Sequence, residues 1–223
     1  MKRFLRRMLT PIAPNALNMT QPVSRIFGLD RGRPIDRHYI EQFLDGHRDA
    51  IRGRVLEVAD TTYTHRYGRD ITEAVALHVA GNGRPDTLTG DLGCPESLPA
   101  ARFDCFVCTQ TFNFIYDVHA AIAGAAHVLR PGGTLLATVA GISQISRYDM
   151  DRWGDYWRFT SASCARLFSE HFAQVDIRAY GNVLAATAFL QGMAVEDLAD
   201  PTWLDVPDDD YQLLIGIRAR TAA

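Results

Sequence analysis

Short apolar runs of strand length recur along the chain, separated by segments whose apolar residues follow helical spacing. The apolar runs predict seven strands, within residues 54–59, 71–79, 86–92, 101–109, 134–140, 174–182 and 211–220. The helical spacing predicts four helices, at residues 35–51, 118–129, 161–172 and 183–199. We expect Pro131, Gly132 and Gly133 to end the second of these helices. Strands that alternate with helices predict a doubly wound α/β sheet.

The connection between the first two predicted strands is unusually short. It holds about eleven residues, whereas a crossover between parallel strands needs roughly a dozen or more. Two explanations stay open. Either the helix after the first strand is very short, or the second strand begins elsewhere.

Composition points to an ordinary globular protein. Apolar residues make up 47% of the 223 residues and charged residues 22%, which suits one well-packed domain. Residues 1–34 are rich in proline, arginine and asparagine, so we expect an N-terminal arm there and a single domain over residues 35–223. The net charge of −3 provides no basic field for nucleic acid.

The cysteines and the N-terminus suggest a protein of the cytoplasm. Cys105 and Cys108 have C-x-x-C spacing, but they lie on a predicted strand, where residues three apart point to opposite faces. We therefore expect core thiols and no metal site. No run is apolar enough to span a bilayer. Basic and apolar residues alternate in segment 1–14. Either an amphipathic turn on a membrane or a frayed terminus would explain this pattern.

In a doubly wound sheet, ligands bind at the carboxyl ends of the strands. After the first strand come Glu57 and the turn 60–64. Asp91 and Leu92 follow the third strand. The residues after the fourth and fifth strands are Thr109, Gln110, Thr111, Asn113 and the segment 141–159.

Five segments give the chain a family resemblance: VLEVAD, GDL, FDCFVCTQTFNFIYD, VLRPGGTLLATVAG and DYWRFT. They resemble the class I S-adenosylmethionine-dependent methyltransferases over residues 35–180. The resemblance implies a Rossmann-like methyltransferase fold, with a mostly parallel seven-stranded sheet whose last strand is antiparallel. It also implies S-adenosylmethionine as the cofactor.

The same resemblance assigns cofactor-binding roles residue by residue. Glu57 matches the acidic end of the first family motif, and Asp91 matches the acid that accepts a hydrogen bond from the adenine amino group. Leu92 would pack against the adenine ring, and Thr109 and Gln110 would line the methionine end. The full cofactor set is Arg37, Tyr39, Glu57, Ala59, Asp91, Leu92, Thr109 and Gln110.

The chain departs from the family pattern at two places. Ala59, Asp60 and Thr61 stand where the family has glycines, which allow a close backbone approach and a positive φ. Whether the side-chain hydroxyl groups of Thr61 and Thr62 replace these glycines in binding the cofactor stays open. The second strand lacks the acid that binds the ribose hydroxyls, since Val75–Leu77 lie near that point and Glu73 comes earlier. Such a loss would weaken binding by about 1–3 kcal/mol.

A second cluster of candidate functional residues, aromatic rings with interleaved aspartates and arginines, lies in the segment SRYDMDRWGDYWRFT, residues 146–160. Aromatic rings stack on sugar faces, and carboxylates and guanidinium groups bind hydroxyls, so this segment suits a polyhydroxylated substrate. The predicted substrate-binding residues are Arg152, Trp153, Tyr156 and Trp157. A structural lid is the alternative interpretation.

Methyl transfer to oxygen needs a base for the hydroxyl proton. Asp149 and Asp151 are the predicted catalytic residues; Asp155, His119 and His65 are weaker candidates. The sequence thus favours an O-methyltransferase acting on a small hydroxylated acceptor such as a sugar or glycoside. The alternative is a methyltransferase-like protein that binds a ligand or partner, or catalyses a non-methylating reaction. We expect a small-molecule substrate, no nucleic acid and no stable membrane insertion, and a homodimer stays open.

Overall fold

The computed structural model describes residues 19–81 and 83–223. The basic segment 1–14 lies outside the described residues. None of the helices in the described part of the chain is long and apolar enough to cross a membrane.

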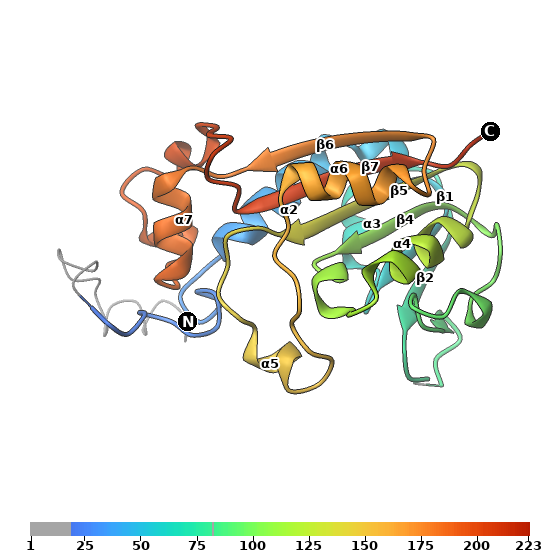
Figure 1. The fold of residues 1–223 in the computed structure, drawn as a ribbon, viewed down its shortest axis with the longest axis horizontal. Helices are drawn as coiled ribbons and strands as arrows, with labels where there is room; N and C mark the ends of the chain where they lie inside the picture. Colours follow the sequence, from blue (N-terminus) through green and yellow to red (C-terminus); the bar gives the residue numbers. More distant parts are fainter. Residues whose placement is uncertain (1–18, 82) are drawn as a thin grey trace.

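Within the described residues, seven strands form one sheet in the order β3-β2-β1-β4-β5-β7-β6 (Figure 1). Strands β1 to β5 pair in parallel, and β7 runs antiparallel to both β5 and β6. This confirms the predicted mostly parallel sheet with an antiparallel last strand. The strands are β1 Gly53–Val58, β2 Ile71–His78, β3 Thr87–Thr89, β4 Phe103–Thr109, β5 Leu129–Ala140, β6 Gln174–Tyr180 and β7 Leu214–Arg220.

Helices cover both faces of the sheet, which is why its central strands are apolar throughout. The α-helices are α2 Ile35–Asp45, α3 Thr62–Tyr67, α4 Val118–His127, α5 Arg147–Met150, α6 Ser161–Ser169 and α7 Val183–Leu190. The 3-10 helices are η2 Arg48–Ala50, η3 Pro95–Ser97, η4 Phe112–Phe114, η5 Val195–Asp197 and η6 Pro201–Asp205. One core lies under α4 and α6, and the other lies under α2, α3 and α7.

The two core cysteines follow the prediction from strand alternation. Cys105 belongs to the core under α2 and α7, and Cys108 belongs to the core under α4 and α6. Both are fully buried, and burial raises the pKa of the Cys108 thiol to about 12. The pair therefore fills two separate cores and shares no ligand.

The structure resolves one open question, and several predicted helix ends shift. The short connection after β1 holds α3, a helix of only six residues, so the first explanation is correct. Helix α4 ends at His127, before Pro131–Gly133, which lie inside β5 instead. The predicted helix 183–199 stops at Leu190 because Gly192 takes a positive φ of +72° beside the backbone of Ser24, where a side chain would collide.

Residues 19–34 pack against the chain that follows α7. The amide of Val23 donates to the carbonyl of Gln191 at 2.8 Å. Arg31 donates through Nε to Asp197 at 2.7 Å and through a second nitrogen at 3.1 Å. Only 1% and 2% of these two side chains are exposed. A buried ion pair therefore fixes this part of the predicted arm to the domain.

Breaking this ion pair should destabilise the fold. Arg31→Met leaves the buried Asp197 carboxylate without its cation, so we expect a loss of about 3–5 kcal/mol in the free energy of unfolding. Arg84→Met is the matched control, because Arg84 pairs with Asp86 at an exposed site. That change should cost under about 1 kcal/mol. Urea unfolding followed by tryptophan fluorescence measures both, and equal losses would contradict a structural role for the buried pair.

Candidate active site

A cleft of about 1030 Å³ runs along the carboxyl ends of β1, β2, β4 and β5. Residues Ile26 to Glu41 contribute one wall, and the loop that carries α5 contributes another. The volume is at the upper end of the roughly 300–1,000 Å³ typical of ligand pockets. The cleft can therefore hold two small molecules side by side.

The floor of the cleft is the turn between β1 and α3. Glu57 is buried there, and its carboxylate accepts hydrogen bonds from the amides of Tyr63 and Thr64, at 3.0 and 2.7 Å, and from the Thr64 hydroxyl at 2.7 Å. Burial raises the pKa of Glu57, while these hydrogen bonds oppose the rise. The carboxylate is thus used mainly to fix the first turn of α3.

Ala59 takes a backbone conformation that normally requires glycine. Its φ is +70°, in the left-handed region. Gln110, which follows β4, also has a positive φ, of +49°. The turn therefore keeps a glycine-type backbone without a glycine. The hydroxyls of Thr61 and Thr62 make no capping bond at α3, whereas Asp60 accepts from the amide of Thr62 at 2.8 Å.

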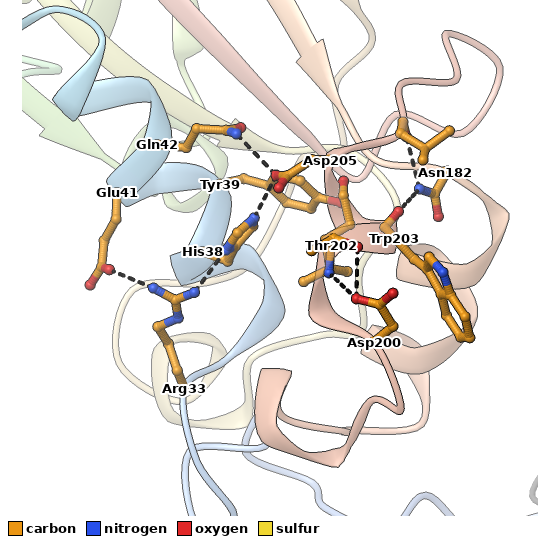
Figure 2. A network of polar contacts seen from close by, with 12 residues as sticks. Arg33, His38, Tyr39, Glu41, Gln42, Asn182, Asp200, Thr202, Trp203 and Asp205 are labelled. Carbon is orange, nitrogen blue, oxygen red and sulfur yellow. Dashed lines mark hydrogen bonds and ion pairs between the residues drawn. The ribbon is translucent and has the colours of Figure 1, made fainter.

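Helix α2 forms the roof and is fastened to η6. His38 Nε2 lies 3.1 Å from Asp205, and Arg33 lies 2.8 Å from His38 Nδ1 and 3.2 Å from Glu41 (Figure 2). Because an arginine only donates, Nδ1 of His38 accepts here, and the Nε2–H of His38 donates to the Asp205 carboxylate. The contacts join α2 to η6 through the imidazole ring of His38.

Tyr39 points away from the cleft, contrary to the predicted position near the cofactor. Its side chain is 1% exposed, and its hydroxyl donates to the carbonyl of Leu204 at 2.8 Å. Helical geometry explains this, since Tyr39 lies on the apolar stripe of α2 that faces the core. Arg37 and Asp36 come from the same helix but line the cleft.

The structure brings the other predicted cofactor residues together. Seven of the eight line this one cleft: Arg37, Glu57, Ala59, Asp91, Leu92, Thr109 and Gln110. Asp91 accepts from the amide of Gly93 at 2.8 Å, which leaves its second oxygen for a ligand.

Sequence reasoning missed His78 at the end of β2. We expected Val75–Leu77 near this point, but Val75 is part of the core and the strand ends at His78, which lines the cleft. Glu73 pairs instead with Arg54 and Arg102 near the start of the strand, at 3.4 and 2.6 Å. The available signal was the carboxyl end of the predicted strand 71–79, where His78 is the last residue but one, rather than the middle of the strand.

The segment 146–160 divides into a part inside the cleft and a part outside it. Asp149, Arg152 and Trp153 line the cleft, and Asp149 accepts a hydrogen bond of 2.5 Å from the Ser146 hydroxyl. Asp151 is exposed and lines no part of the cleft. Asp155 and Arg158 also line the cleft, but the Asp155 side chain is buried and accepts from Arg158 at 2.5 and 2.9 Å, so this pair anchors the loop.

Tyr156 and Trp157 do not line the cleft. The Tyr116 and Trp157 rings stack with centroids 6.2 Å apart, and the Trp157 indole donates to the carbonyl of Ile115 at 3.1 Å. Tyr156 packs edge-on against Tyr116. The predicted substrate set is therefore split, with only Arg152 and Trp153 facing the cleft. His119 and His65 line no part of it either.

Comparison with known proteins supports the class. Residues 51–137 match a family model described as "Methyltransferase domain". The N-methyltransferase NodS from Bradyrhizobium japonicum WM9, solved with S-adenosyl-L-homocysteine, is 15% identical with a TM-score of 0.54, over 86% of this chain and 89% of that chain. A SAM-dependent methyltransferase from Archaeoglobus fulgidus is 10% identical with a TM-score of 0.54, over 83% and 94%.

A structure of the [4+2]-cyclase SpnF is also similar, at 16% identity and a TM-score of 0.53, over 86% of this chain and 84% of that chain. A search of curated proteins finds no match. The fold is that of the class I S-adenosylmethionine-dependent methyltransferases, which confirms the predicted resemblance. The domain match within that fold supports a methyltransferase enzyme, and S-adenosylmethionine is the cofactor of this class.

The conformation of Ala59 leads to a test of the turn. A non-glycine residue with a positive φ costs roughly 1–3 kcal/mol, so Ala59→Gly should raise the free energy of unfolding by about 1 kcal/mol. Ala101→Gly is a matched control, because Ala101 has a φ of +49° at an exposed position outside the cleft. Both variants should be stabilised, but only Ala59→Gly should bind S-adenosylhomocysteine more tightly, by about tenfold or 1.4 kcal/mol.

Calorimetric titration measures the affinity, and urea unfolding measures the stability. An equal change of affinity in the two variants, or none in Ala59→Gly, would contradict a cofactor role for the turn.

Asp36 gives the cleft a titratable group near neutral pH. Burial raises the pKa of Asp36 from 3.8 to about 6, against the opposing effect of Arg37. The folded state therefore binds the proton more tightly than the unfolded state does. The stability that Asp36 contributes is full below pH 3.8 and is lost as the pH rises through about 6.

Asp36→Asn should remove this dependence. Between pH 4 and pH 7 the wild type should lose the free energy of unfolding that protonated Asp36 contributes, whereas the variant has no such contribution to lose. The variant should therefore become more stable relative to the wild type as the pH rises. The exposed Asp151→Asn should instead run parallel to the wild type. Urea unfolding at several pH values measures the difference. If the free energies of unfolding of Asp36→Asn and the wild type changed in parallel with pH, the raised pKa of Asp36 would be contradicted.

Proposed function

We propose that the protein is an S-adenosylmethionine-dependent O-methyltransferase whose acceptor is a small hydroxylated molecule, a sugar or a glycoside. One observation carries the proposal. The loop with Asp149, Arg152 and Trp153 lines the same cleft as the strand-end residues that match the family's cofactor positions. Acceptor chemistry and cofactor chemistry therefore meet in one cavity.

The cleft residues fit the polar groups of the cofactor. Arg37 and Asp36 carry opposite charges and suit the carboxylate and ammonium groups of the methionine part. His78, at the end of β2, can exchange hydrogen bonds with ribose hydroxyls in place of the missing acid. Asp91 would accept from the adenine amino group, with Leu92 beside the ring. When bound, the cofactor supplies an electrophilic sulfonium methyl group.

The outer part of the cleft suits a sugar ring. Tyr148 and Trp153 line it although 66% and 52% of their surfaces are exposed, and the Arg152 guanidinium lies 3.6 Å from the centre of the Tyr148 ring. Exposed aromatic faces stack on the apolar faces of sugars, and the arginine donors reach the hydroxyls. Tyr156 and Trp157 would contact only the part of a longer acceptor that extends beyond the cleft.

Asp149 is the proposed general base. Its carboxylate lines the cleft and is oriented by the Ser146 hydroxyl, so it can accept the proton that the acceptor hydroxyl loses as its oxygen attacks the methyl group. Asp151 is exposed outside the cleft and is dropped from the proposed mechanism.

The setting of the enzyme is part of the proposal. All four cysteines are free, which supports a reducing compartment such as the cytoplasm, where a biosynthetic tailoring step would take place. The alternative function, a non-methylating reaction in the same cleft, is supported by the absence of glycine at Ala59 and by the similarity to the cyclase SpnF. Cofactor turnover separates the two.

The test is methyl transfer with matched aspartate variants. S-adenosylhomocysteine release is measured with a panel of monosaccharides and aryl glycosides. With the best acceptor, Asp149→Asn should lower kcat by about 100-fold or more because the base is lost. Asp151→Asn should stay within about twofold, since that carboxylate lies outside the cleft.

Equal rates for the two variants would overturn the role of Asp149. Failure to bind S-adenosylmethionine at millimolar concentration would overturn the methyltransferase proposal and favour the non-methylating alternative.

A further inference from the structure

A second cavity, of about 230 Å³, lies at the edge of the sheet opposite the cleft. It forms where β1 and β5 begin and β7 ends. It shares no lining residue with the cleft. The lining residues are Asp49, Ala50, Arg52, Asp104, Arg130, Gly132, Thr134, Arg218 and Arg220. Four arginines thus surround a space far smaller than the main site.

The strand register explains why these side chains converge. Arg218 and Arg220 are two residues apart on β7, so they point to the same face of the sheet. Arg220 pairs with Thr134 of β5, which brings a hydroxyl group to that face. Arg52 precedes β1, and Arg130 lies at the start of β5. Arginine side chains from separate segments of the chain therefore line the same cavity.

Carboxylates neutralise only part of this charge. Arg218 lies 3.3 Å from Asp49, and Arg130 Nε lies 2.5 Å from Asp104. Arg220 makes only a long hydrogen bond, 3.4 Å, to the carbonyl of Gly132. The guanidinium group of Arg52 has no hydrogen-bond or ion-pair partner within residues 19–81 and 83–223. The cavity keeps two positive charges in excess, although the whole chain carries a net charge of −3.

Guanidinium groups held around one cavity repel one another, which costs stability unless an anion lies between them. Their planar N–H groups match the oxygens of phosphate, which accept bidentate hydrogen bonds. The volume is below the roughly 300 Å³ of the smallest common pockets for drug-sized ligands, so the ligand is small. A compact polyanion satisfies both the charge and the size.

We propose that this cavity is a binding site for a small phosphate-type polyanion, of the class of pyrophosphate or a phosphate monoester. Arg52 and Arg220 bind its oxygens directly, and Thr134 donates from the wall. Arg130 and Arg218, already paired with carboxylates, add to the positive field. The site does not depend on the proposed methyl transfer.

Calorimetric titration of the full chain with sodium pyrophosphate at low ionic strength tests the site. We expect binding that the double variant Arg52→Gln/Arg220→Gln weakens by about tenfold or more. Arg166→Gln is the matched control, because Arg166 is an exposed arginine on α6 without a partner in the described chain. That variant should bind pyrophosphate as the wild type does.

Thermal unfolding without anions gives an independent reading. Because repulsion is relieved, the double variant should unfold at a higher temperature than the wild type, and pyrophosphate should remove the difference by stabilising only the wild type. Equal binding in the double variant and the wild type would overturn the site. Tighter binding of a short single-stranded oligonucleotide than of pyrophosphate would overturn the small-anion class.

Discussion

The buried carboxylate of Glu57 organises the ligand edge of the sheet. It lies near the end of β1 and accepts three hydrogen bonds from the first turn of α3. A buried carboxylate is tolerated only when its oxygens are bonded in this way, so the chain must turn at once into a helix. In the few residues between β1 and α3, one residue adopts a left-handed φ. Ala59 takes this conformation, and the floor of the cleft follows from it.

The walls of the cleft are held by polar contacts between distant segments. Arg31 and Asp197 join residues 19–34 to η5, and His38 and Asp205 join the roof helix to η6. Asp155 and Arg158 anchor the loop that carries Asp149. Each contact is short, and two of the three include a buried carboxylate. Fixed walls reduce the ordering that binding requires, and they hold both reactants in a defined geometry.

Most of the fold was predictable because apolar periodicity reports burial directly. The seven strands and their order of appearance follow from runs such as Phe103–Thr109, which are buried on both faces. The site was less predictable. Tyr39 and Arg37 are two residues apart on one helix, yet only Arg37 faces the cleft. Tyr156 and Trp157 share a loop with Trp153, but they stack on Tyr116, a partner that sequence spacing does not reveal.

Loss of glycine in the turn does not by itself mean loss of the cofactor site. Glycine is favoured there because it takes a positive φ without strain, but the surrounding hydrogen bonds can impose the same φ on alanine. The methyl group of Ala59 adds volume at the cleft floor, whereas the donor direction of the backbone is unchanged. The affinity for the cofactor would then be lowered by the backbone strain at Ala59 and by contact with its methyl group, and not by a missing hydrogen bond. If the turn binds the cofactor as proposed, the site would be weakened rather than lost, and cofactor in excess over its dissociation constant would still fill it.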